Sequence, residues 1–153
     1  MTNDPPASLR HTLQFRIRYS ETDQMGTFYN SRALEWFECG RTEMLRALGM
    51  PYTAMEERGL FLPLVAAHVE YQGRARYDDL LQLSTTLRLA GRARVRLDVE
   101  IVQAETSKAV ACGYTVHAFT DRNGRPIRPP DWFLSLVAGV PGSPKPATVC
   151  GPA

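Results

Sequence analysis

One stretch of this chain, residues 31–48, has the period of a long helix. Its apolar residues recur at steps of three or four positions, at Ala33, Phe37, Gly40, Met44 and Leu48. That spacing collects them on one helical face, while most charged residues fall elsewhere. Asn30 or Ser31 can cap the start, and Gly49 followed by Pro51 can end the helix. We therefore expect one long amphipathic helix early in the chain.

The other periodic segments alternate with a period of two, which is typical of half-buried strands. They lie at residues 13–19, about 62–72, 81–89, 95–101 and 110–118. Residues 121–124, Asp-Arg-Asn-Gly, form a hairpin-turn signal, and residues 51–59 and 131–136 can form short helical turns. A single long helix beside four or five such strands predicts an α+β fold, with an antiparallel sheet wrapped around the central helix.

The length of 153 residues and an apolar content of 44% indicate one globular domain. We expect a flexible N-terminus over residues 1–11 and a domain over 12–136. Residues 137–153, with four prolines and three glycines, are expected to be a disordered tail. The polar N-terminus has no signal-peptide core, and no apolar run reaches membrane-spanning length, so the expected location is cytoplasmic with no membrane partner.

The net charge of +2 is too small to favour nucleic acid as a partner. No metal, dinucleotide or P-loop motif is present, so no cofactor is expected. Almost all the basic residues are arginine, which suits phosphate recognition but can also reflect only a GC-rich genome.

The segment Tyr19-Ser20-Glu21-Thr22-Asp23-Gln24-Met25-Gly26-Thr27-Phe28-Tyr29-Asn30 joins the first strand to the long helix. Asp23 is thus a carboxylate in a loop that ends at a helix N-terminus, where backbone N–H groups are free. Such an arrangement is a candidate acyl-transfer site. The alternative is structural, with Asp23 closing an Asx turn before Gly26.

The pattern Tyr19-x-x-Thr22-Asp23-x-x-Gly26-x-x-Tyr29, followed by Trp36-Phe37-Glu38-x-x-Arg41, resembles hot-dog-fold acyl-CoA thioesterases. The resemblance is to the 4-hydroxybenzoyl-CoA thioesterase and YbgC-like type. Residues 70–79 and the closing hairpin at 115–127 also resemble that family. The match covers residues 12–136 and implies the hot-dog fold and hydrolysis of an acyl-CoA.

The resemblance implies that Asp23 is the catalytic carboxylate, acting as nucleophile or general base, and that the backbone N–H of Asn30 is the oxyanion donor. Many YbgC-like members carry His where this chain has Asn30. Tyr29, Leu62 and Pro63 are substrate-binding residues that the resemblance implies, and Gly26 either allows the substrate to approach closely or is an ordinary turn glycine. Arg92 and Arg94 belong to four arginines, at positions 88, 92, 94 and 96, around a predicted turn at Gly91, where they either bind substrate phosphates or form a solvated surface. Leu62 and Pro63 would face the acyl group, and the arginines would hold coenzyme A phosphates.

Several alternatives stay open. The same fold hosts thioester dehydratases or isomerases and non-catalytic acyl-CoA binders. Some relatives place their carboxylate on the central helix, where this chain has Glu35, Glu38 and Glu43. The acyl group and the carrier, coenzyme A or an acyl-carrier protein, are not specified by the sequence. The resemblance also implies a homodimer or homotetramer, with Asp23 near residues 60–64 of a partner.

Overall fold

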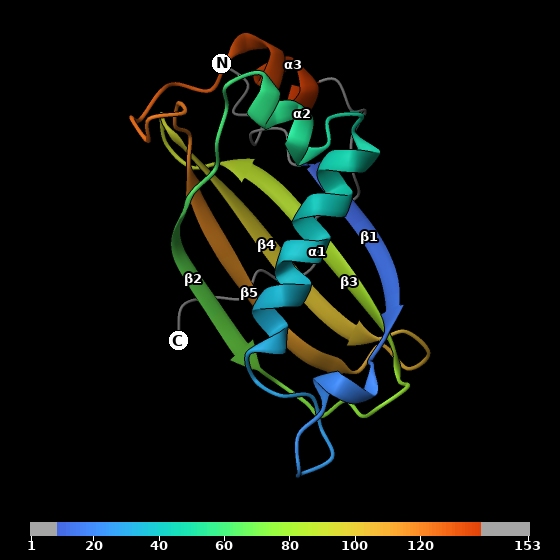
Figure 1. Cartoon of the computed structure of the whole chain (residues 1–153). Helices are drawn as coiled ribbons and strands as arrows, with labels where there is room; N and C mark the ends of the chain where they lie inside the picture. Colours follow the sequence, from blue (N-terminus) through green and yellow to red (C-terminus); the bar gives the residue numbers. More distant parts are fainter. Residues whose placement is uncertain (1–8, 139–153) are drawn as a thin grey trace.

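The computed structural model describes residues 9–138, which form one five-stranded antiparallel sheet and its covering helices (Figure 1). The long helix α1 (Arg32–Ala47) crosses one face of the sheet. The short helices α2 (Tyr52–Glu57) and α3 (Asp131–Ala138) lie together at one end of it. In chain order the strands are β1 (Leu9–Arg16), β2 (Leu64–Tyr71), β3 (Leu80–Leu89), β4 (Arg94–Gln103) and β5 (Ala109–Ala118). The sheet wrapped around a central helix is as expected from the sequence.

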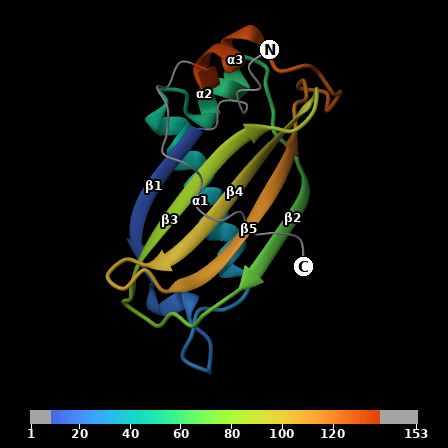
Figure 2. The same cartoon turned by 180° about the vertical axis from the view of Figure 1, so that it is seen from behind.

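The strands lie in the order β1-β3-β4-β5-β2, so the strand that follows α2 becomes an edge strand (Figure 2). Register follows the period-two pattern. In β4, Val95, Leu97 and Val99 are buried in the core, while Arg94 is exposed on the other face. A one-residue slip would turn this apolar row away from α1, so burial fixes the register.

Helix α1 packs closely on the sheet because Gly40 has no side chain. A Cβ at this position would lie 2.5 Å from both Leu83 Cδ2 and Thr85 Oγ1. The helix begins at Arg32, and its N-cap residue Ser31 makes no side-chain capping hydrogen bond. The boundaries therefore agree with the predicted ones to within a residue, whereas the predicted side-chain cap does not form.

The edge strand β2 is largely exposed, although several of its residues are apolar. Leu64, Val65 and Tyr71 are 56%, 47% and 53% exposed. Strand β2 pairs only with β5 within residues 9–138, so its other edge carries no partner strand there. Natural proteins usually cover such an edge.

Both predicted domain boundaries differ slightly from the observed elements. Strand β1 already begins at Leu9, which pairs with Leu87, so residues 9–11 belong to the sheet. At the other end α3 extends to Ala138, and Phe133 packs edge-to-face on Phe119 with ring centroids 5.1 Å apart. The expected tail from residue 139 onward, like residues 1–8, lies outside the described residues. No helix within the described range is long and apolar enough to cross a membrane.

Candidate functional site

The Asp23 loop is a closed turn that backbone hydrogen bonds hold in place. The Asp23 N–H donates to the Thr27 carbonyl (2.8 Å), and the Gly26 N–H donates to the Asp23 carbonyl (3.1 Å). Gly26 has φ of 76°, a conformation that favours glycine. The loop is also attached to the segment after β2, because the Phe28 N–H donates to the Ala75 carbonyl (2.9 Å).

The Asp23 carboxylate has one occupied oxygen and one available oxygen. Oδ1 accepts the N–H groups of Met25 (2.8 Å) and Thr27 (3.4 Å), which is the Asx turn that the sequence offered as an alternative. Within residues 9–138 no donor forms a hydrogen bond with Oδ2. The turn and a catalytic role are therefore compatible, since the first uses one oxygen and leaves the second for chemistry.

The buried residue Glu21 holds the loop in place, although the sequence analysis did not identify it. It is 4% exposed, and its carboxylate accepts hydrogen bonds from the Arg18 N–H (2.7 Å), the Arg18 guanidinium (3.1 Å) and the Trp36 indole (3.0 Å). Burial alone would raise the pKa of Glu21, but these donors together lower the pKa below its usual value. Its backbone carbonyl also accepts the Tyr29 N–H (2.8 Å), so Glu21 joins the loop to the approach to α1.

The approach to α1 carries backbone donors without an acceptor. The Tyr29 carbonyl accepts the Arg32 N–H (3.0 Å) and the Asn30 carbonyl accepts the Ala33 N–H (3.4 Å). In the part of the chain that the structure describes, the N–H groups of Asn30 and Ser31 have no acceptor. These are the orphan donors of a helix N-terminus, where a developing negative charge is stabilised.

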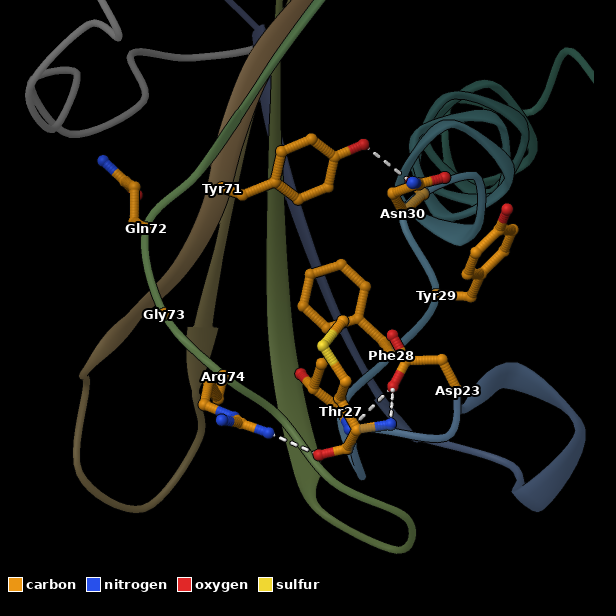
Figure 3. Close-up of a pocket in the computed structure, with 10 residues that line it drawn as sticks. Asp23, Thr27, Phe28, Tyr29, Asn30, Tyr71, Gln72, Gly73 and Arg74 are labelled. Atoms are coloured by element: carbon orange, nitrogen blue, oxygen red, sulfur yellow. Dashed lines mark hydrogen bonds between the residues drawn. The ribbon is translucent and has the colours of Figure 1, made fainter.

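The two parts of the site meet in a hollow of about 430 Å³ (Figure 3). The ring of Tyr71 projects from the end of β2 toward Asn30, and its hydroxyl donates to the Asn30 carbonyl (2.7 Å). On the same side of the hollow as Tyr71, the Arg74 guanidinium donates to the Met25 carbonyl. The hollow is lined by Asp23, Met25, Thr27, Phe28, Tyr29, Asn30, Tyr71, Gln72, Gly73 and Arg74.

Of the residues predicted for the site, the structure brings together Asp23, Tyr29 and Asn30, and Gly26 shapes their loop. Leu62 and Pro63 precede β2, at the opposite end of that strand from Tyr71. Eight residues of strand span on the order of 25 Å, so these two side chains do not reach Asp23 within one chain.

Arg92 and Arg94 also lie away from Asp23. Arg92 lies in the turn between β3 and β4, and Arg94 is the first residue of β4. This turn is at the end of the sheet near α2 and α3, whereas the Asp23 loop lies at the other end (Figure 1). Arg74 is the arginine that lines the hollow. Its sequence neighbourhood carried the family resemblance, but nothing in the spacing marked this side chain.

The alternative carboxylates on α1 do not line the hollow. Glu35 is paired with Arg32 (2.9 Å), and Glu43 is paired with Arg46. Glu38 likewise does not line it. Tyr71 was missed as well, because the contact with Asn30 depends on where the edge strand lies. Among residues 9–138 no group of three His, Cys, Asp or Glu side chains could hold a metal ion.

Comparison with known proteins identifies the family. The family model described as the thioesterase-like superfamily matches residues 17–137. A candidate esterase of Aquifex aeolicus is 30% identical over 122 residues, which cover 80% of this chain and 93% of that protein. The acyl-CoA thioesterase YbgC of Haemophilus influenzae is 38% identical over 71 residues, or 46% of this chain. The chain spans about half, 52%, of that relative's length.

The fold has close structural relatives. A 1,4-dihydroxy-2-naphthoyl-CoA thioesterase from Synechocystis superposes with a TM-score of 0.81 at 20% identity, over 88% of this chain and 99% of that one. This likeness confirms the hot-dog fold that the resemblance implied. The family match and the YbgC relative confirm the resemblance itself.

Proposed function

The chain belongs to the thioesterase-like superfamily, and we propose that it is an acyl-CoA thioesterase that cleaves its substrate in the Asp23 hollow. The observation that carries this proposal is that one hollow is lined both by Asp23, whose carboxylate has a free oxygen, and by Asn30, whose backbone N–H is free. Thioester hydrolysis requires these two parts: a group that delivers the nucleophile and donors for the charge on the carbonyl oxygen.

Asp23 Oδ2 delivers the nucleophile by one of two routes. As general base it takes a proton from water, whose oxygen attacks the thioester carbonyl carbon. As nucleophile it attacks that carbon itself, and water then cleaves the mixed anhydride. In both routes the C–S bond breaks, the thiolate of coenzyme A leaves and takes up a proton, and the acid is released.

The N–H of Asn30 supplies the donor for the charge on the carbonyl oxygen, since it is already oriented before the reaction begins. Removing one such donor from other enzymes costs about 2.7–4 kcal/mol of barrier. The side chain of Asn30 is not required, so Asn30→Ser should keep most activity. Asn30→Pro, which lacks the N–H, should be inactive. A severe loss in a folded Asn30→Ser variant would show that the amide side chain takes part.

The predicted substrate-binding residues that lie away from Asp23 can contribute to its hollow only from a second subunit. Pairing of two β2 edges about a two-fold axis would be antiparallel, so the Leu64 end of one strand would lie beside the Tyr71 end of the other. Leu62 and Pro63 of that second copy would then face the acyl group, and its Arg92 and Arg94 would lie nearer the coenzyme A phosphates. A fully active monomer in light scattering at assay concentration would contradict this arrangement.

The substitution Asp23→Asn tests the proposed function. Asn keeps the Oδ1 acceptor of the turn, so the loop should stay closed while kcat falls by at least about 100-fold. Activity is measured as release of free thiol from a panel of acyl-CoAs, and Asp131→Asn, in α3, is the control. Near wild-type turnover by Asp23→Asn would leave Asp23 with a structural role alone.

The same assay separates the other classes. A dehydratase or isomerase would change the acyl chain without releasing thiol, and a binder would do neither. The panel would also identify the acyl group and, with acyl-carrier-protein thioesters added, the carrier. A cytoplasmic location stays part of the proposal, and cell fractionation would test it.

A further inference from the structure

Tyr71 connects the edge strand to the start of the central helix. It is the last residue of β2, and its hydroxyl donates to the Asn30 carbonyl at 2.7 Å, across 41 positions of sequence. Its ring stacks on Phe28, with centroids 6.0 Å apart and an angle of 29° between the planes. Phe28 is 5% exposed and packs on Trp36, so the ring of Tyr71 rests on a fixed surface.

The hydroxyl acts on the peptide that directly follows the free Asn30 N–H. The carbonyl of Asn30 and the N–H of Ser31 belong to the same planar peptide and point in opposite directions, so the Ser31 N–H points away from Tyr71 and the donor that can serve the hollow is that of Asn30. The other bond to this carbonyl, from the Ala33 N–H, is long at 3.4 Å. The bond from Tyr71 is therefore the shorter restraint on the plane that follows Asn30.

The position of Tyr71 does not suit a role in stability alone. The side chain is 53% exposed, so water can replace its hydroxyl at the Asn30 carbonyl. Helix α1 is already held by its buried apolar face. Catalysis is more demanding, because oxyanion donors must lie within about 2.7–3.1 Å of the developing charge.

We propose that Tyr71 is a positioning residue: its hydroxyl fixes the peptide that follows Asn30 and so holds the preceding N–H, that of Asn30, toward the thioester. The inference rests on the proposed thioesterase function. It assigns to the edge strand a direct influence on the oxyanion site, because Tyr71 is the last residue of β2.

The variant Tyr71→Phe removes the hydroxyl and keeps the ring on Phe28. We expect kcat to fall about tenfold, equivalent to about 1.4 kcal/mol, with KM within about twofold and an unchanged melting temperature. The matched control is Tyr77→Phe. Tyr77 is similarly exposed at 56%, stacks edge-to-face on Tyr19 and does not line the hollow. A kcat within about twofold of wild type in Tyr71→Phe would overturn the proposal.

A second readout does not depend on turnover. The backbone amide resonances of Asn30 and Ser31 should shift in Tyr71→Phe and stay in place in Tyr77→Phe. If the wild-type protein hydrolyses no acyl-CoA and these resonances still shift, the proposed function fails while the positioning contact stands. If the resonances do not shift, Tyr71 does not orient these peptides, whatever the enzyme's activity.

Discussion

Replacing Glu21 by Gln should lower the free energy of unfolding by about 1–2 kcal/mol at neutral pH. Gln has nearly the shape of Glu and keeps one acceptor oxygen, so the change removes the charge and leaves the packing. The carboxylate of Glu21 is 4% exposed and serves three donors, two from Arg18 and one from Trp36.

The size of this loss in stability depends on which of the three donors can form a hydrogen bond with water in place of Glu21. The Arg18 side chain is 72% exposed, so its ion pair with Glu21 is screened and contributes little. The Trp36 indole is buried at 3% exposure and depends on Glu21. A hydrogen bond to a charged acceptor contributes about 1.5–3 kcal/mol and one between neutral groups about 0.5–1.5 kcal/mol, which gives the expected difference.

The assay is urea denaturation of wild type and variant from pH 7 to pH 3. The pKa of Glu21 is lowered in the folded state, so its contribution is present above the unfolded value of about 4.3 and is lost as pH falls through the folded value. The difference between wild type and Glu21→Gln should therefore shrink at acid pH.

The control is Glu43→Gln, in an ion pair with Arg46 whose side chains are 48% and 54% exposed. That substitution should change stability by less than about 0.5 kcal/mol. Equal stability of wild type and Glu21→Gln at pH 7, or a difference that persists unchanged to pH 3, would refute the reasoning.

Two further changes test the core. Burial and, secondarily, the nearby Arg41 lower the pKa of His117, so the free energy of unfolding should decrease as pH falls below about 6.5. In thermal melts, His117→Asn should reduce this dependence on pH. If the variant keeps the wild-type pH dependence, other groups cause it. Gly40→Ala should destabilise by about 1 kcal/mol, because overpacking against Leu83 and Thr85 outweighs the gain in helix propensity; denaturation showing a more stable variant would mean that α1 can shift outward.

Much of the fold could be predicted from the sequence because local periodicity carries it. The helix over residues 31–48 and the alternation over 95–101 each reflect a single buried face, and burial fixes both. Asp23, Tyr29 and Asn30 could be placed together because one short loop holds them.

The remaining features depend on contacts between distant segments. Tyr71 reaches Asn30 only because β2 crosses to the far edge of the sheet, and strand order leaves no local signal. The four arginines around the Gly91 turn looked like a substrate site because they are close in sequence, yet the turn lies at the opposite end of the sheet from Asp23 (Figure 1). The burial of Glu21 beneath the loop could not be predicted either, since its donors come from α1 as well as from its own turn.

The strand order also governs when the site can form during synthesis. Strand β2 leaves the ribosome before β5, its only partner strand within the described residues. Leu64 therefore cannot pair with His117 until β5 has been synthesised. Until then its exposed apolar side chains and both backbone edges are unpaired, a state prone to association with other chains. Tyr71 is carried on this strand, so the hollow beside Asp23 should be among the last parts of the domain to assemble, and a chain ended before β5 should lack it.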